Sequence, residues 1–293
     1  TITRLLSVWQ EEYKAWRKRS LAGREYVYVW ADGVYFNIRL EEDRLACLVI
    51  VGVLPDGRKE VIALEDGYRE STESWASVLR DLKRRGMAAP VLAIGDGNLG
   101  FWAALRDVYP GTKKQRCWKH KIANVLDKLP KRLQAKAKEQ LHEIMYAPDR
   151  DSALEEIAVF EKAYGVRYAQ AVETLTKDQD RMLNFFDFPA EHWLHLRTTN
   201  PIESTFATVK ARTKKTKGAG SRKAGLAMAF KLLLAAEHRW RKVNAPHLVA
   251  LVKAGVGFPN GEAEMFQAEP EPEELFMPIP WILAADGVPI NNI

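Results

Sequence analysis

The hydrophobic periodicity of this chain changes along its length, and this change limits the folds that it can adopt. Three segments rich in β-branched and aromatic residues favour antiparallel strands: 26–30, 34–40 and 45–54. Helical spacing follows at 71–85 and 99–108, and strand-like segments stand between and after these helices, at 90–95 and 113–118. The order β-β-β-α-β-α-β predicts an α/β domain with one mixed sheet covered by helices.

The rest of the chain has helical periodicity. An amphipathic helix is expected at 5–18, and residues 121–192 carry helical spacing and good helix formers without a strand signal. Asn200-Pro201 is typical of a helix start, residues 217–221 interrupt that helix, and 222–242 favours a second long one. We expect the Pro- and Glu-rich remainder to be extended or disordered.

Composition narrows the class of protein. The 293 residues are 47% apolar and 28% charged, as in a globular domain, and no apolar run reaches the length of a membrane span. The N-terminus lacks the apolar block of a signal peptide, and two cysteines, Cys47 and Cys117, are too few for a disulfide scaffold. These features predict a protein of a reducing compartment, the cytoplasm or the nucleoid, without a membrane partner.

The charge is distributed unevenly. After Lys253 the chain has seven acids and no Lys or Arg, so removing this tail from the net charge of +6 leaves +13 for residues 1–253. Residues 204–236 contain eight bases and no acid. A charge run is often only a solvated helix face, but one this long and of one sign favours contact with a polyanion such as DNA.

Three carboxylates stand where a metal site could form. Asp32 lies in VYVWADGVYF, Asp96 in LAIGDGNLGF and Glu203 in TTNPIESTF. Phosphodiester chemistry can be run by two divalent ions about 4 Å apart, held by carboxylates. Such a site needs acids that converge without neutralising bases among them, and the glycines beside Asp96 would leave room for metal and phosphate.

The order of these elements resembles the ribonuclease-H-like fold of DDE transposases, and more specifically the Mutator-type bacterial insertion-sequence transposases. The resemblance covers roughly residues 26–242. It rests on local matches in the family's order: WADGVY, RESTESWASVLRDLKRRGM, GDGNLGFWAAL, QRCWKHKIANVLDKLPK and TTNPIEST.

The resemblance implies a transposase that cleaves double-stranded DNA at transposon ends and joins it to a target. Asp32, Asp96 and Glu203 would hold two Mg²⁺ ions, for which Mn²⁺ could substitute, and the protein would act as a homodimer on DNA. Three rivals remain: a related nuclease or integrase, a domesticated DNA-binding protein without the chemistry, and a two-carboxylate hydrolase of sugars, which the basic run disfavours.

Periodicity, charge distribution and the resemblance together divide the chain into five parts, of which the tail has no match in the family pattern. They are an N-terminal helix and lead-in (1–25), the first part of the catalytic domain (26–120), a helical insertion between the second Asp and the Glu (121–192), the completion of the catalytic domain (193–245) and an acidic Pro-rich tail (246–293).

Each acid has a simpler alternative. Asp32-Gly33 between two strand-like runs is a strong hairpin signal, although the family context favours a metal ligand. Asp96 follows an apolar strand, and open sheets bind ligands at such carboxyl ends. Glu203 could instead complete a capping box begun at Asn200.

Other motif residues are also open to two interpretations. Cys117-x-x-His120 has the spacing of half a zinc site, but structural zinc needs four ligands, so a structural role or an approach of His120 to DNA or a carboxylate is favoured. Trp193 could stack on an extruded base or lie in the core.

The predicted DNA-binding side chains are mostly cationic. Lys210 is seven residues after Glu203 and shares its helix face, whereas Arg212 is rotated away. The full set of candidates is Lys119, His120, Trp193, Lys210, Arg212, Lys214, Lys215, Lys217 and Arg222.

Overall fold

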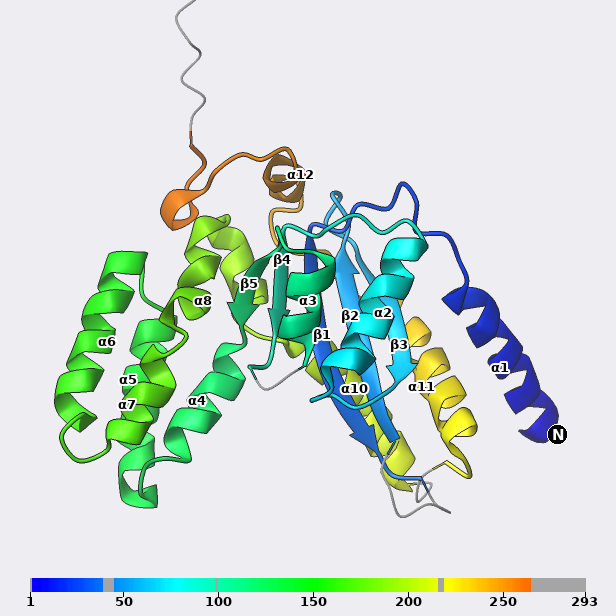
Figure 1. Ribbon diagram of the computed structural model, residues 1–293, viewed down its shortest axis with the longest axis horizontal. Helices are drawn as coiled ribbons and strands as arrows, with labels where there is room; N and C mark the ends of the chain where they lie inside the picture. Colours follow the sequence, from blue (N-terminus) through cyan, green and yellow to red (C-terminus); the bar gives the residue numbers. More distant parts are fainter. Residues whose placement is uncertain (1, 39–44, 98–99, 216–218, 265–293) are drawn as a thin grey trace, which may run out of the picture.

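A mixed five-stranded sheet forms the centre of the protein (Figure 1). The computed structural model describes residues 2–38, 45–97, 100–215 and 219–264. The strands lie in the order β3-β2-β1-β4-β5, with β1–β2 and β2–β3 antiparallel and β1–β4 and β4–β5 parallel. Their bounds are β1 Tyr28–Phe36, β2 Leu45–Val53, β3 Lys59–Asp66, β4 Leu92–Gly95 and β5 Lys113–Arg116. This arrangement of strands and helices is consistent with a ribonuclease-H-like fold.

The first strand runs unbroken through Asp32-Gly33, so the predicted break at this dipeptide is wrong. Asp32 pairs with Val49 and Gly33 with Leu48 in the β1–β2 ladder, which also rules out the hairpin turn. Arg69 packs directly against Gly33 and leaves no room for a side chain there, because a Cβ on Gly33 would lie 2.4 Å from Cβ of Arg69. Long-range pairing and packing override the local turn signal.

The third antiparallel strand is β3, which the sequence pattern did not indicate. Its apolar part is only the four residues 61–64, and charged residues stand on both sides of it. Edge strands of a sheet are often short and polar at their ends, which weakens their signal in the sequence. The expected segment 45–54 is β2.

Helices cover both faces of the sheet (Figure 1). Alternate side chains of β1 point to opposite faces, so Val29 and Ala31 join one core cluster while Tyr28 and Trp30 join the other. The first cluster lies under α2 (Thr72–Arg84) and α3 (Phe101–Val108). The second lies under α1 (Ile2–Arg17), α10 (Asn200–Lys215) and α11 (Arg222–Glu237), and α11 ends five residues before its predicted end.

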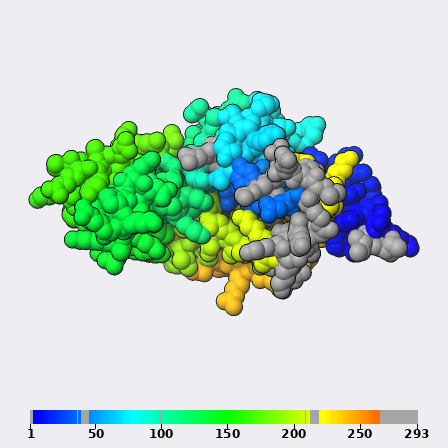
Figure 2. All heavy atoms as spheres, turned by 90° about the horizontal axis from the view of Figure 1, so that it is seen from below, coloured from blue at the N-terminus to red at the C-terminus, as the bar shows by residue number. Residues whose placement is uncertain are grey.

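A helical region forms one end of the elongated molecule, opposite α1 (Figures 1 and 2). The described residues 121–192 contain no strand, as the sequence predicts. The helical region extends slightly beyond these bounds at both ends. It consists of α4 Trp118–Leu126, α5 Lys131–Met145, α6 Arg150–Tyr164, α7 Ala169–Thr176, α8 Gln179–Leu183, η1 Asn184–Asp187, η2 Ala190–His192 and α9 Trp193–Leu196.

The segment 246–264 is folded, so the expectation of an extended or disordered chain is wrong for it. It contains α12 (Leu248–Lys253) and the turn η3 (Pro259–Gly261), and it buries Val249 and Phe258. A Cβ on Gly261 would lie 2.7 Å from the Trp193 ring, which shows how closely this segment contacts the body. Residues 265–293 of the predicted tail lie outside the described residues.

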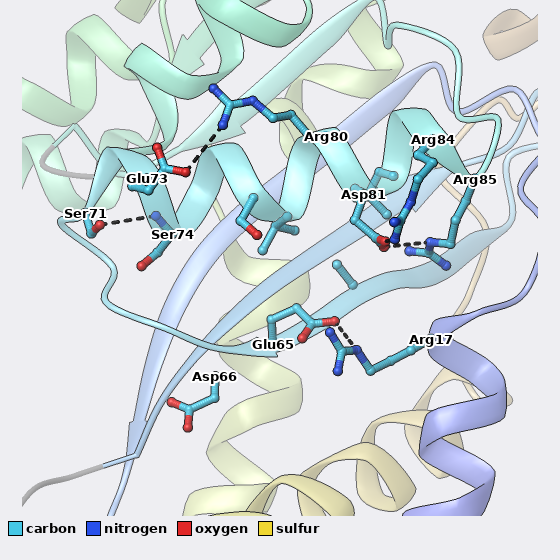
Figure 3. A pocket seen from close by; sticks show the side chains of 14 residues that line it. Arg17, Glu65, Asp66, Ser71, Glu73, Ser74, Arg80, Asp81, Arg84 and Arg85 are labelled. Carbon is cyan, nitrogen blue, oxygen red and sulfur yellow. Dashed lines mark hydrogen bonds and ion pairs between the residues drawn. The ribbon is translucent and has the colours of Figure 1, made fainter.

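A polar cavity of about 860 Å³ lies where edge strand β3 faces α1 and α2 (Figure 3). Its charges are paired: Arg17 bonds Glu65 at 2.6 Å, and Arg85 bonds Asp81 at 2.9 Å. The charges that line the cavity therefore neutralise one another.

Across the described ranges, no helix is long and apolar enough to cross a membrane.

Replacing Phe258 tests the docking of the C-terminal segment. Phe258 is 3% exposed, so Phe258→Ala should lower the free energy of unfolding by about 3 kcal/mol, measured by urea denaturation. Leu251 in the same segment is 40% exposed, and Leu251→Ala should cost about 0.5 kcal/mol or less. Equal small effects of both variants would contradict a docked segment.

Candidate active site

The register of the parallel strands aligns three candidate residues. Ala31 of β1 pairs with Gly95 of β4, and Gly95 pairs with Arg116 of β5. The next residues are Asp32, Asp96 and Cys117, so they lie at one level of the sheet, where β4 and β5 end. The N–H of Cys117 donates to the carbonyl of Gly95 at 2.8 Å. Carboxyl ends of parallel strands are where α/β sheets bind ligands.

Asp32 is a buried carboxylate, with 6% of the residue exposed. Its Oδ1 accepts a hydrogen bond from the N–H of Gly33 at 2.8 Å. Burial raises the pKa of Asp32, while the nearby His120 and Arg69 act to lower it. The charged form of Asp32 therefore depends on cations around it.

Asp96 is equally buried, and only one of its oxygens is paired. Oδ2 accepts a hydrogen bond from Nη2 of Arg69 at 2.7 Å, whereas Oδ1 is buried without a hydrogen-bond partner. Buried polar atoms are nearly always satisfied, so an unpaired carboxylate oxygen calls for an explanation. A divalent cation is a fitting partner for it, because Mg²⁺ prefers carboxylate oxygen.

The glycines next to the two aspartates make room for arginines. A Cβ on Gly97 would lie 1.4 Å from Nη2 of Arg116, just as one on Gly33 would collide with Arg69. Arg116 in turn forms an ion pair with Asp178 of the helical region. The expected space for metal and phosphate beside Asp96 is thus filled, on the Gly97 side, by a protein side chain.

Glu203 reaches the site from the first turn of α10. The hydroxyl of Thr199, the residue before the helix, donates to Oε1 of Glu203 at 3.0 Å, and Lys119 forms an ion pair with Oε2. Burial acts to raise the pKa of Glu203, but the bonds from Lys119 and Thr199 outweigh it and lower the pKa.

The capping box is not formed in this structure. The Thr199 N–H lies 3.4 Å from Sγ of Cys117, and the Asn200 N–H lies 3.4 Å from the hydroxyl of Thr198. The carboxylate of Glu203 is therefore directed to Lys119 and Thr199 and not to the helix start.

Cys117 and His120 lie beside Glu203. Within the described part of the chain, these three residues are the group whose potential ligand atoms all lie within 4.8 Å of one another. Contact with the Cys117 thiol raises the pKa of His120 to about 9 against the effect of burial, and Asp96 and Asp32 raise it further. Burial acts to raise the pKa of Cys117, but His120 and Thr199 outweigh it and lower the pKa. His120 thus approaches the carboxylates, one of the roles considered for it.

The expectation of carboxylates without neutralising bases is wrong. Arg69 pairs with Asp96 and Lys119 with Glu203, and His120 lies near Asp32. Among the described residues, Asp32, Asp96 and Glu203 do not form a group as tight as that of Cys117, His120 and Glu203. Buried acids need such cations, because an uncompensated charge is costly away from water.

Trp193 occupies the core, which favours the structural alternative over base stacking. It is 8% exposed, and its Nε1–H donates to the carbonyl of Phe188 at 2.7 Å. The rings of Phe185 and Phe186 pack edge-on against it. A base could not stack on a ring so enclosed.

The predicted DNA-binding cations have different environments. Lys210 is exposed on α10, and Lys119 is exposed beside Glu203. Arg222 bonds Asp66 at 2.8 Å, so part of its charge is used within the protein. The side chains of Arg212, Lys214 and Lys215 and the whole of Lys217 lie outside the described residues.

Sequence reasoning missed Arg69 and Thr199 as members of the site. Arg69 is the first residue of the quoted RESTESWASVLRDLKRRGM motif, but it stands 27 residues before Asp96 and no local spacing links the two. Thr199 lies in the quoted TTNPIEST motif, but its bond to Glu203 depends on the conformation at the start of α10.

Known proteins that are similar to this chain are transposases. The family described as "Transposase, Mutator family" matches residues 1–242. The transposase for insertion sequence element IS6120 of Mycolicibacterium smegmatis is 59% identical over 261 residues, which cover 89% of this chain and 81% of the relative.

A second similar protein is the transposase for insertion sequence element IST2 of Acidithiobacillus ferrooxidans, 48% identical over 88% of each chain. A more distant one, for ISRM5 of Rhizobium meliloti, is 31% identical over 69% of this chain and 51% of its own. The family match covers most of the chain, and the sheet, the aligned aspartates and the glutamate on α10 accompany it. The chain therefore belongs to the Mutator family of transposases.

Proposed function

We propose that this transposase hydrolyses a phosphodiester at a transposon end and joins the freed 3′-hydroxyl to a target strand. The observation that carries the proposal is the alignment of Asp32 and Asp96 on adjacent parallel strands, with Glu203 brought over the same sheet by α10. Transposases act on DNA, and the name of the family implies DNA cleavage.

Asp32, Asp96 and Glu203 would hold two Mg²⁺ ions, or Mn²⁺ in their place. When bound, such ions activate the attacking oxygen and stabilise the leaving one. The unpaired Oδ1 of Asp96 supports this assignment, because a buried carboxylate oxygen without a hydrogen bond suits a cation. A carboxylate triad needs no covalent protein–DNA intermediate.

Neighbouring cations prepare the acids for this role. Lys119 holds the pKa of Glu203 low, and Arg69 and His120 counter the effect of burial on Asp32. The anion of Glu203 is therefore favoured, whereas burial still raises the pKa of Asp32 and the two cations oppose that rise. Lys119, 62% exposed in its side chain, would also face the phosphate backbone of a DNA strand held at Glu203.

The division of the chain follows from this assignment. We propose residues 26–120 and 193–245 as the catalytic domain, with 121–192 as a helical insertion between the second Asp and the Glu of the triad. A homodimer on DNA stays a prediction of the family resemblance, as does the target at transposon ends.

Substituting the triad tests the chemistry. Asp32→Asn, Asp96→Asn and Glu203→Gln should each slow cleavage of transposon-end DNA with Mg²⁺ by at least about 100-fold, because each removes a charge that the reaction needs. Circular dichroism and DNA binding in EDTA should stay close to wild type, and EDTA should stop wild-type cleavage.

Asp107→Asn serves as the matched control for these variants. Asp107 is an exposed acid on α3 whose ion pair is with Arg80, so its substitution should leave cleavage unchanged. A folded Asp96→Asn protein that nicks DNA at the wild-type rate would refute the assignment.

Lys210 tests the path of the DNA. Seven residues place it on the helix face of Glu203, so Lys210→Ala should weaken DNA binding and make the slope of log K against log salt shallower by about one. It should also slow single-turnover cleavage, because the scissile phosphate is held less firmly. The control is Lys231 on α11, whose side chain bonds Glu12 at 2.6 Å. If Lys231→Ala weakened DNA binding more than Lys210→Ala, the DNA would have to lie elsewhere.

A further inference from the structure

A second cavity, of about 680 Å³, lies beside the candidate active site. Its lining comes mainly from the end of α5, from α9, from the first turn of α10 and from residues 240–244. Lys119 lines it and also pairs with Glu203, so the cavity and the site share a side chain. Asn200 and Ser204, which flank Glu203 on α10, line it as well.

The charge of this cavity is of one sign. Its described lining contains no Asp or Glu, and its cationic members are Lys59, Lys119, Arg197, Arg241 and Lys242. The cavity of Figure 3 differs, because there the arginines bond neighbouring carboxylates. A one-signed cavity selects for an anion.

Arg197 is the buried member of this set. The residue is 7% exposed, and its Nε is buried without a hydrogen-bond partner. The guanidinium carbon lies 4.7 Å from the ring centroid of Phe185, 5.1 Å from that of Tyr146 and 5.4 Å from that of Trp193. In the described part of the chain, no carboxylate forms an ion pair with it.

Other buried cations of the protein have such partners. Arg116 and Lys121 share Asp178, and the half-buried Arg69 bonds Asp96. Burial lowers the pKa of Arg197 to about 10, which leaves it charged at neutral pH. Aromatic rings attract a guanidinium but satisfy none of its N–H donors, so the group lacks the anion that would compensate it.

We propose that this cavity binds the DNA backbone and that Arg197 contacts one of its phosphates next to the cleavage site. The assignment rests on the proposed function, since it takes DNA as the substrate at Glu203. Guanidinium forms two parallel bonds to phosphate oxygens, which suits a fixed arginine held by three rings. Arg241 and Lys242, exposed at the rim, would neutralise neighbouring phosphates.

The test measures DNA binding without chemistry. A fluorescein-labelled 30-bp duplex is titrated with the full chain in EDTA over a series of salt concentrations. Arg197→Met keeps an apolar stem among the rings and removes the charge, so affinity should fall about tenfold or more and the salt slope should become shallower by about one. Arg197→Lys should keep the wild-type slope with weaker affinity.

The controls separate binding from folding. The melting temperature of Arg197→Met should equal or exceed that of wild type, because an uncompensated buried charge is removed. Arg80→Met removes the same charge from an exposed arginine on α2, which bonds Asp107 of α3 at 3.1 Å. This variant should leave the salt slope of DNA binding unchanged. If Arg197→Met does not fold, Arg241→Met replaces it in the test, and its salt slope of DNA binding should likewise become shallower by about one.

Two results would overturn the proposal. One is an unchanged affinity and salt slope in folded Arg197→Met. The other is a melting temperature that inorganic phosphate raises in wild type but not in Arg197→Met, with equal DNA binding by both, which would identify a small-anion site. All binding is measured in EDTA, without cleavage. These measurements therefore test the phosphate contact of Arg197 even if the triad assignment is wrong.

Discussion

The parallel pairing of β1, β4 and β5 is the constraint on which the candidate site depends. The register Ala31–Gly95–Arg116 sets Asp32, Asp96 and Cys117 side by side. Slipping one strand by a single residue would turn its side chains to the opposite face of the sheet and separate the two aspartates. Because the core clusters on both faces fix each strand by its apolar side chains, packing far from the acids determines their alignment.

Burial of the acids explains the cations around them. Asp32 and Asp96 are both 6% exposed, and a buried carboxylate is stable as an anion only near positive charge. Arg69 can reach Asp96 because glycine stands at position 33, and Lys119 and His120 come from the helix that follows β5. Gly33 and Gly97 thus make room for Arg69 and Arg116. Arg69 bonds Asp96 at the end of β4, and Arg116 bonds Asp178 of the helical region.

The helical region and Glu203 are joined through a short segment. Trp193 packs among Phe185 and Phe186, the N–H of Arg197 donates to the carbonyl of Trp193 at 3.0 Å, and the N–H of Trp118 donates to the carbonyl of Arg197 at 2.9 Å. Two residues later Thr199 bonds Glu203. The aromatic core of the helical region therefore sets where α10 begins, and with it the location of the glutamate.

The sequence by itself determined the periodic elements: the helices at 71–85 and 99–108, the strand before Asp96, the helical character of 121–192 and the basic run after Glu203. These features repeat over short spans, so local propensity and spacing encode them. It also indicated Asp32, Asp96 and Glu203 as a set, through motifs in family order. Only the tertiary structure decided that β1 continues through Asp32-Gly33, that β3 completes the sheet, that 246–264 docks on the body and that Arg69 and Lys119 pair with the acids. Each of these depends on contacts between residues far apart in the chain. Such contacts produce no hydrophobic periodicity, so the pattern of the sequence does not reveal them.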